Sequence, residues 1–568
     1  MELLIVVVLG LLGIAAATAI GPRLGVAAPL LLVIVGIVVS FLPFVPDVEI
    51  DPEWILVGVL PPLLYSASVA MPSMEFRREF GVISGLSVVL VVVSAVALGL
   101  LFSWLVPGLG LAAGIALGAI VSPTDAVATS IVKRVGVTPR IVTVLEGESL
   151  LNDATALVLL RSAIAATAAS VSFWEIAGDF VFAVVVAVAI GYVVGRANLW
   201  VRSRVTDAAV NTVISFTVPF LAAVPSEMLG ASGLVAAVVA GLVTGRGAIR
   251  DLSPQHRTSD VQSWRTIELI LEGAVFLVMG LEMSAIIGDL QDEARGIAVG
   301  WRIAAIALLA VLIVRALYML PVLALQRRGV RRGANMKPRL AAVQERFDRA
   351  ARPPAPAGAN ARRGRGRAQP ALSAEALERF RTRIRRKVAD IDYFMAGPLG
   401  WREGTVIVWA GMRGAVTLAA AQTLPHETPD RSLIVFIAFL VAAGSLVIQG
   451  GTLPWIVRLV KPAGIDREAA RVEHTELHAM LRGVADDVVH EHREASLDAG
   501  APEAARNAVA DREARRALRL EIIEAQREAL LAARDDGTFS ASVLTGALDM
   551  LDADQISIEL RDEHRDEA

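Results

Sequence analysis

The stretch GESLLND, residues 147–153, places four polar side chains inside a largely apolar part of the sequence. Glu148 and Asp153 supply carboxylates, Ser149 a hydroxyl and Asn152 an amide. Oxygen donors of these kinds bind hard cations, and a carboxylate also binds a proton. The alternative is a polar contact between helices, but one amide would suffice for that. The composition therefore favours a site for an ion or a proton.

On a helix these four side chains divide between two directions. At about 100° per residue, Ser149 and Asp153 lie about 40° apart with Asn152 beside them, whereas Glu148 points about 140° away from Asp153. We therefore expect Ser149, Asn152 and Asp153 to share one cavity, and Glu148 to have a different partner.

A second polar group lies in VSPTDAVATS, where Thr124 and Asp125 follow Pro123. Proline removes a backbone donor and clashes with the preceding turn, so it disrupts a helix and frees carbonyl groups. Together with the threonine hydroxyl and the carboxylate, these carbonyls would form an oxygen cage for a hard cation. The alternative is an aspartate that only caps a broken helix.

Two further charges lie within apolar segments. Arg413, in VWAGMRGAVTLAA, keeps its charge and needs an anion or carbonyl groups. We expect Glu148 to be its partner in a structural ion pair. Glu272, in ELILEGAVFLVMGLEM, would either line an entrance to the site or pair locally. A charge at the centre of a bilayer costs at least ~2.5–3.5 kcal/mol, so such residues usually face a cavity or a partner.

The composition indicates a membrane protein. The 568 residues are 55% hydrophobic, with a mean hydropathy of +0.59, which is too apolar for a soluble chain of this size. The sequence has no cysteine, which excludes disulfides and thiolate catalysis. About 20 apolar residues cross a bilayer as a helix. Thirteen segments qualify: 3–20, 24–44, 54–72, 82–106, 110–131, 139–169, 174–195, 207–224, 229–245, 266–288, 299–325, 401–425 and 432–459.

The charges of the connecting loops predict the orientation of these segments. If the N-terminus is outside, the short inside loops carry 13 Lys and Arg, and the outside loops carry two. Positive loops remain in the cytoplasm. We therefore expect an all-α polytopic protein with about thirteen spans, the N-terminus outside and the C-terminus in the cytoplasm, in the plasma membrane.

The charge pattern divides the chain into four parts. Residues 1–325 and 401–460 form the two parts of a transmembrane domain. Residues 326–400 form a basic cytoplasmic insert, with 19 Lys and Arg against 6 Asp and Glu. Residues 461–568 form an acidic helical tail, in which residues 462–568 hold 13 Arg against 25 Asp and Glu. We expect the insert to face anionic lipid rather than nucleic acid, since its Arg-rich stretch has no interleaved aromatic residues. Insert and tail could also associate and regulate the protein, or remain two independent solvated segments.

These motifs together resemble a known family. SPTDAVA, GESLLND about 25 residues later, and GMRGAVTLA in a late span occur in the order found in sodium/proton exchangers of the cation:proton antiporter-1 family. LPPLLYSA at residues 60–67 and EGAVFLVMGLE also fit. The resemblance covers about residues 1–460, and it is the combination of motifs that is specific.

The resemblance implies roles for the residues. Asp153 would bind the cation and the proton in turn, with Thr124 and Ser149 as further Na⁺ ligands and with Asp125 at the crossing of two broken helices. Glu148 and Arg413 would form a structural ion pair, and Asn152 is the amide that distinguishes these exchangers from relatives with an Asp-Asp pair. Some members place another acidic ligand on an early helix, where this chain has Ser66. The fold would contain inverted repeats, in a homodimer that needs no cofactor.

The mechanism implied is secondary active transport rather than enzymatic catalysis. Na⁺, or Li⁺, and H⁺ would compete for Asp153, and the loaded domain would move by alternating access. With Asn at 152 a single carboxylate cycles, so we expect electroneutral exchange of one Na⁺ per H⁺, serving pH homeostasis. One alternative is K⁺/H⁺ exchange on the same fold. Another is an ion channel or sensor that does not exchange. An intramembrane aspartyl protease is disfavoured because its Tyr-Asp and Gly-x-Gly-Asp motifs are missing.

Overall fold

The structure is a computed structural model that describes residues 2–43, 51–168, 173–292, 297–351, 374–425, 427–464, 467–498 and 508–566. It contains two compact units, one formed by residues 1–322 and 401–465 and the other by residues 323–400 and 466–568. Within the described ranges the regular structure is helical apart from one isolated bridge between Val137 and Gly464. This confirms the all-α class. The Arg-rich stretch PPAPAGANARRGRGRAQP of the insert, residues 353–370, lies outside the described residues.

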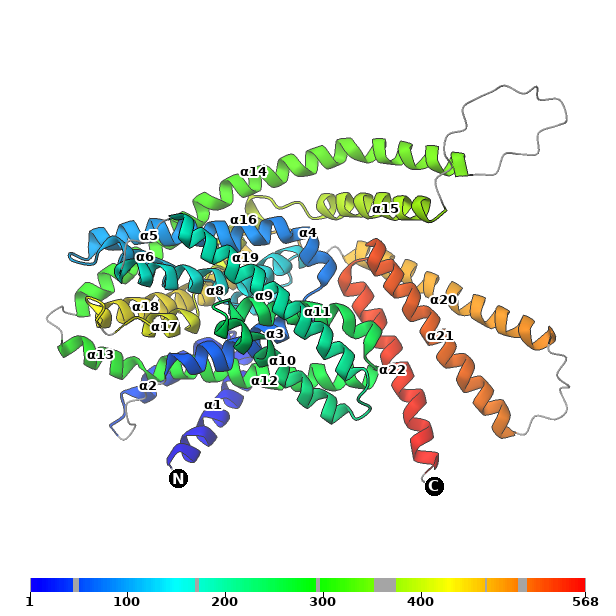
Figure 1. Cartoon of the computed structure of the whole chain (residues 1–568), viewed down its shortest axis with the longest axis horizontal. Helices are drawn as coiled ribbons and strands as arrows, with labels where there is room; N and C mark the ends of the chain where they lie inside the picture. Colours follow the sequence, from blue (N-terminus) through cyan, green and yellow to red (C-terminus); the bar gives the residue numbers. More distant parts are fainter. Residues whose placement is uncertain are drawn as a thin grey trace. The chain divides into compact units, whose positions relative to one another are not determined.

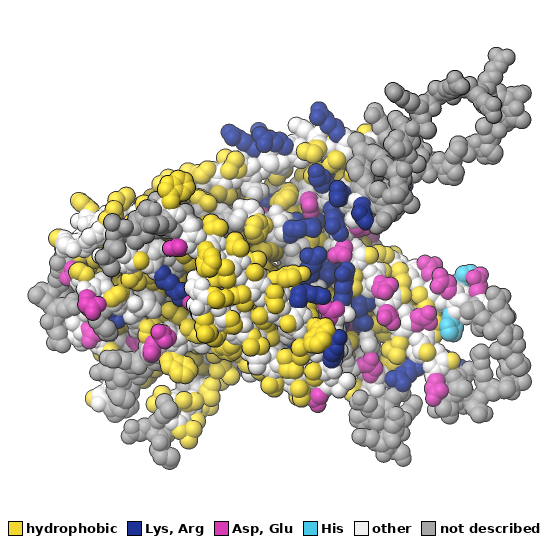
Figure 2. Space-filling model, in the orientation of Figure 1, with side chains coloured by type: hydrophobic (Ala, Val, Ile, Leu, Met, Phe, Trp, Pro, Cys, Tyr) yellow, Lys and Arg dark blue, Asp and Glu magenta, His cyan; other side chains and the backbone are white. Residues whose placement is uncertain are grey.

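Among the described residues, nine helices are long and apolar enough to cross a membrane. Three shorter apolar helices accompany them, at Ala28–Ser40, Trp54–Ala70 and Leu111–Val121. Many large side chains on these helices point outward, such as Leu9 (62% exposed), Val193 (64%) and Leu317 (60%). Figure 2 shows hydrophobic side chains over most of the visible face of these helices. Helices with apolar surfaces all round suit a lipid environment.

The first unit contains two bundles (Figure 1). The first bundle carries the polar motifs and consists of α4 (Ser73–Ser84), η2 (Gly85–Leu90), α5 (Val91–Leu105), α6 (Leu111–Val121), α7 (Val127–Val135), α8 (Pro139–Ala168), α16 (Trp401–Trp409), α17 (Ala415–Gln422), α18 (Arg431–Ser445), η3 (Leu446–Gly450) and α19 (Gly451–Val460). The long helix α14 (Ile297–Ala351) contributes its N-terminal part to the same bundle, where Gly300 lies against Phe436 of α18.

The second bundle consists of α1 (Glu2–Leu24), α2 (Ala28–Ser40), η1 (Trp54–Val59), α3 (Leu60–Ala70), α9 (Phe173–Arg202), α10 (Ala208–Met228), α11 (Gly233–Asp251) and α12 (Pro254–Leu281). Small residues allow its helices to approach closely. A Cβ atom on Gly36 of α2 would lie 2.8 Å from the Cα atom of Gly280 in α12. The short helix α13 (Met283–Asp292) follows α12 and packs on α18 and α2. The two bundles meet where α3 and α11 contact α8 and where α12 contacts α17.

The second unit contains the C-terminal part of α14 together with α15 (Ala374–Ala396), α20 (Arg467–Asp498), α21 (Ala508–Asp536) and α22 (Ala541–Asp566). The three tail helices bury an apolar core that includes Leu477, Ile523 and Leu551. Basic α15 packs on α21, where Arg385 lies 3.5 Å from Asp536. A part of the basic insert and the acidic tail therefore contact each other within this unit.

Candidate ion-binding site

The four polar residues of GESLLND lie near the middle of α8, where all four are buried. They form two rows with i, i+4 spacing, which places each pair on one side of the helix. Glu148 and Asn152 form one row, and both hydrogen-bond to Thr124. Ser149 and Asp153 form the other. The Asn152 amide thus shares Thr124 with Glu148, whereas the sequence grouped Asn152 with Ser149 and Asp153.

The predicted helix break at Pro123 is confirmed, because α6 ends at Val121 and α7 begins at Val127. The break is held from α8: the Asn152 amide donates to the Thr124 hydroxyl (2.7 Å) and to the Thr124 carbonyl (3.2 Å). One oxygen of Asp125 accepts the backbone N–H of Val127 at 2.9 Å. Asp125 thus caps the start of α7, where the helix dipole favours a negative charge.

A second break separates α16 from α17 at residues 410–414 and crosses the first. The N–H of Asp125 donates to the carbonyl of Met412 at 2.8 Å. Gly414 lies so close to Asp125 that a Cβ atom there would overlap its carboxylate. The crossing therefore requires glycine at 414. The resemblance predicted two broken helices crossing at Asp125, and the second break lies here, within the predicted segment 401–425.

Arg413 donates hydrogen bonds to backbone carbonyls of both helix breaks. Its Nε donates to the carbonyl of Val121 at 2.8 Å, one Nη donates to the carbonyl of Ser122 at 3.4 Å, and the other donates to the carbonyl of Gly411. These carbonyls lie at the C-terminal ends of two helices, where partial negative charge gathers. Arg413 is therefore neutralised by helix ends and not by a carboxylate.

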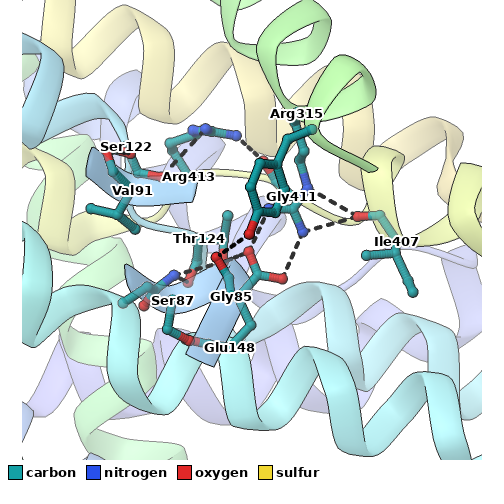
Figure 3. A network of polar contacts seen from close by, with 12 residues as sticks. Gly85, Ser87, Val91, Ser122, Thr124, Glu148, Arg315, Ile407, Gly411 and Arg413 are labelled. Atoms are coloured by element: carbon teal, nitrogen blue, oxygen red, sulfur yellow. Dashed lines mark hydrogen bonds and ion pairs between the residues drawn. The ribbon is translucent and has the colours of Figure 1, made fainter. Parts of the chain in front are cut away.

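The partner of Glu148 is Arg315 of α14 (Figure 3). The guanidinium donates to both oxygens of the carboxylate, with one Nη–Oε distance of 2.7 Å, and its Nε and one Nη donate to the carbonyl of Ile407 at 3.1 and 3.0 Å. Both side chains are 2% exposed. The predicted Glu148–Arg413 pair is therefore wrong: Glu148 is fully engaged by Arg315 and Thr124.

Two hydrogen bonds hold the π-helical segment η2 beside this pair. Tyr318, one turn after Arg315 on α14, donates to the carbonyl of Gly85 at 2.8 Å. Ser87 donates to the carbonyl of Glu148 at 3.1 Å. A π-helical turn leaves backbone groups displaced from the regular pattern, and such turns are frequent at functional sites. Here the displaced turn is tied to both α8 and α14.

Asp153 differs from its acidic neighbours. It is 7% exposed and lies close enough to Asp125 for their carboxylates to interact electrostatically. Within the described part of the chain, the structure gives its carboxylate no hydrogen bond and no ion pair. The buried Oδ1 of Asn152 also has no hydrogen-bond partner among the described residues. The site thus contains a carboxylate, that of Asp153, whose charge no described residue neutralises.

The other residues predicted for the site, Ser149, Glu272 and Ser66, lie on three different helices. The Ser149 hydroxyl donates to the carbonyl of Glu146 at 3.1 Å, within its own helix. Glu272 of α12 is half-buried and interacts electrostatically with Asp125, which associates it with the site. Ser66 is buried on α3, a helix that packs against α8.

Sequence reasoning missed Arg315. The sequence VRALY places Arg315 inside the predicted span 299–325, as Arg413 lies inside another span. A buried charge within an apolar span could therefore have identified it.

Comparisons with known proteins agree with this architecture. The chain is 28% identical over 585 residues to an uncharacterized Na⁺/H⁺ exchanger of Mycobacterium bovis, covering 98% of this chain and 96% of the relative. It is 26% identical over 495 residues to a sodium, potassium, lithium and rubidium/H⁺ antiporter of Bacillus pumilus, covering 83% and 64%. The fold resembles that of the sodium proton antiporter MjNhaP1 from Methanocaldococcus jannaschii, with a TM-score of 0.56 and 15% identity over 81% of this chain and 99% of that one.

A protein whose described residues are helical, with nine helices long and apolar enough to cross a membrane, is a polytopic membrane protein. The family profile "Sodium/hydrogen exchanger, transmembrane" matches residues 7–343 and 384–459. The chain therefore belongs to the sodium/hydrogen exchanger family. Its members are transporters of Na⁺ and H⁺ rather than enzymes.

Proposed function

We propose that this protein exchanges one Na⁺, or Li⁺, for one H⁺ across the plasma membrane, with both ions competing for Asp153. The observation that carries the proposal is the buried carboxylate of Asp153, which has no hydrogen bond and no ion pair with any described residue. A carboxylate out of water is costly as a bare anion, so a cation or a proton must neutralise it. The two ions cannot both neutralise one charge, and competition between them follows.

The charges around Asp153 support electroneutral exchange. Glu148 is neutralised by Arg315, and Asp125 caps α7 through one oxygen. Asn152 brings no charge, and its amide nitrogen donates a hydrogen bond to the hydroxyl of Thr124. Asp153 is then the carboxylate that changes between the Na⁺-bound and the H⁺-bound states. One positive charge moves in each direction, so the membrane potential does not drive the cycle.

The crossing breaks supply cation ligands beside this carboxylate. We propose that Thr124, Ser149 and Asp125 take part in Na⁺ binding with Asp153, and that the free Oδ1 of Asn152 is available to the ion. Oxygen ligands of this kind suit a hard cation. Glu272 is proposed as an accessory charge at the entrance, because it interacts with Asp125, and Ser66 as an accessory hydroxyl on α3. The Glu148–Arg315 pair takes the structural role that the sequence had given to Glu148 and Arg413.

The topology proposed is thirteen spans with inverted repeats, the N-terminus outside and the C-terminus in the cytoplasm. Joining each pair of helices across its break or π-helical turn gives one span for each predicted segment, for example α6 with α7 and α16 with α17. The positive inner loops support the orientation. Movement of one bundle against the other would give alternating access. Assembly as a homodimer is proposed on the family resemblance alone.

The test is the collapse of a pH gradient in proteoliposomes after addition of Na⁺, Li⁺ or K⁺, with the membrane potential clamped or free. We expect Na⁺ to collapse the gradient equally under both conditions. We expect Asp153→Asn to lose the exchange, whereas Asp554→Asn, an exposed change in the tail, retains it. A response to K⁺ but not to Na⁺ would establish the alternative substrate. Ion current without exchange would establish a channel.

A further inference from the structure

An ion pair joins the first bundle to the second at a distance from the ion site. Arg161 of α8 donates from one Nη to Oε2 of Glu227 on α10 at 2.9 Å. Arg161 lies eight residues after Asp153, which is about 12 Å farther along the helix. The cation binding proposed above uses neither residue of the pair. The pair nevertheless connects the two bundles whose relative movement would give alternating access.

In the topology proposed above, this ion pair lies on the outer side of the ion site. The basic stretches VKRVGVTPR and RANLWVRSRVTD lie at the starts of α8 and α10, so both helices run outward from the cytoplasm. Arg161 lies in the C-terminal third of α8, and Glu227 is next to the last residue of α10. The pair therefore joins the outer parts of these two helices.

Glu227 is anchored in its own bundle by its other carboxylate oxygen. Oε1 accepts the backbone N–H of Gly233, the first residue of α11, at 2.9 Å. The dipole of α11 favours a negative charge at this end of the helix. A Cβ atom on Gly233 would lie 3.0 Å from Cγ of Glu227, so the glycine leaves room for the glutamate side chain. The position of Glu227 therefore does not depend on Arg161.

Arg161 is the partner that can detach. Its side chain is 60% exposed, whereas that of Glu227 is 31% exposed. In the part of the chain that the structure describes, the guanidinium of Arg161 has no other hydrogen bond and no other ion pair. After separation from Glu227 it would be hydrated by water, and no buried charge would remain. Because exposed ion pairs contribute little to stability, this pair can open and close readily.

An apolar layer separates this pair from the ion site. Leu157 lies one helical turn after Asp153 and one turn before Arg161. It packs against a hydrophobic cluster that contains Val218 of α10 and Leu234 of α11. Apolar contacts exclude water but are not directional, whereas a charge-assisted hydrogen bond fixes a geometry. The ion pair thus adds a directional contact on the outer side of the apolar layer.

We propose that Arg161 and Glu227 form an outer gate of the exchanger: their ion pair holds α8 to α10 and α11 while the outer side is closed, and it separates when the site opens outward. The proposal rests on the exchange function proposed above. Loss of the pair removes a contact made in the outward-closed state, so it shifts the equilibrium toward the outward-open state. Because the pair is exposed, the shift is severalfold rather than complete.

The first test measures access from the outside and does not require transport. The chain has no cysteine, so Leu157→Cys provides a single thiol between the ion pair and the ion site. Its rate of reaction with a membrane-impermeant maleimide, added to the outside of right-side-out vesicles, reports how often the outer side opens. In this background we expect Arg161→Gln and Glu227→Gln each to speed the reaction about threefold. Arg161→Lys, which keeps the positive charge, should react at the parent rate.

The variants are chosen so that the labelling rate reports on the ion pair itself. In Glu227→Gln the amide oxygen can still accept from Gly233, so the start of α11 keeps this contact. Arg196→Gln is the matched control, because Arg196 is also 60% exposed but lies 3.9 Å from Asp251 within the second bundle. It should leave the labelling rate unchanged. Equal rates in the parent, Arg161→Gln and Glu227→Gln would overturn the gate.

The second test is reversible cross-linking of the gate. In Arg161→Cys with Glu227→Cys, a bifunctional methanethiosulfonate should reduce Na⁺/H⁺ exchange in proteoliposomes at least about tenfold, because the outer side can no longer open. Reduction of the cross-link should restore exchange. The same treatment of Arg196→Cys with Asp251→Cys joins helices of one bundle and should leave exchange unchanged.

The two tests separate failure of the gate from failure of the proposed function. Undiminished exchange by the protein cross-linked between positions 161 and 227 would overturn the gate. Absence of exchange in the untreated wild type would count against the proposed function, whereas the labelling rates would still decide whether the ion pair controls access from the outside.

Discussion

At the residue scale, the site combines charges that have fixed partners with the carboxylate of Asp153, which has none among the described residues. Glu148 is held by Arg315, and Arg413 by backbone carbonyls, so these charges are fixed parts of the architecture. Asp153 lies one residue from Asn152, whose amide holds Thr124, yet its own carboxylate has no described counter-charge. The residue that can change its partner is therefore the one we assign to transport.

Breaking the buried ion pair should be costly. Arg315→Met leaves Glu148 buried without a partner, which typically costs 3–5 kcal/mol. We expect a large drop in Tm and loss of exchange. The double variant Arg315→Met with Glu148→Gln should regain part of the stability, because no bare charge remains. Arg458→Met, at an exposed arginine, serves as control. If the single and double variants unfold at the same temperature, the pair does not have the role assigned here.

The sequence identified most of these residues but not all of their partners. Polar groups in apolar segments are conspicuous, so Thr124, Asn152, Glu148 and Arg413 were found. Which arginine meets Glu148 depends on which helices are neighbours, and helix neighbours are not encoded in the spacing along the chain. Arg413 was expected to need an anion or carbonyl groups, and Glu148 was chosen because spacing along the chain does not reveal that the carbonyls of Val121 and Ser122 lie beside Arg413.

At the element scale, two interrupted helices position the site. Pro123 marks the position of the first break in the sequence. The resemblance implied a second break without locating it, because its position depends on the close backbone approach at Gly414. In the tail, which was predicted to be helical, α20 and α21 end at Asp498 and Asp536, next to the glycine-containing stretches LDAGAP and DDGT. Local sequence thus determines where a helix ends, whereas the packing of helices determines that the breaks at 122–126 and 410–414 lie against each other.

Gly414→Ala tests the crossing. The added Cβ atom would overlap the carboxylate of Asp125, so that carboxylate or the backbone of α17 must move. We expect Na⁺-dependent exchange to fall by at least about tenfold, since small displacements in a preorganised site are costly. Gly451→Ala, where an added Cβ would meet nothing within 4 Å, should exchange normally. Normal exchange by Gly414→Ala would show that the crossing tolerates movement.

At the scale of the whole molecule, the chain joins a transport unit to a charged helical unit. The contact of Arg385 with Asp536 joins the basic insert to the acidic tail, and both side chains are partly exposed. A single surface ion pair contributes little, about 0–1 kcal/mol. We propose that the larger charge imbalance between insert and tail tunes transport, with salt weakening the attraction.

Removing residues 464–568 should therefore change how exchange depends on ionic strength. The full chain should respond to salt between about 0.05 and 0.5 M, a range over which the Debye length shortens severalfold. The truncated chain should respond less. The milder Asp536→Asn should lie close to the wild type. Identical salt profiles in the full and truncated chains would mean that insert and tail act independently of transport.

The central claim is that Na⁺ and H⁺ compete for the carboxylate of Asp153. The most direct measurement is proton release when Na⁺ is added to the purified protein in weakly buffered detergent solution, followed with a pH-sensitive dye. The account predicts that Na⁺ displaces up to one proton per chain from the wild type, with less displaced as the pH rises, and none from Asp153→Asn. Equal proton release from both proteins would contradict it.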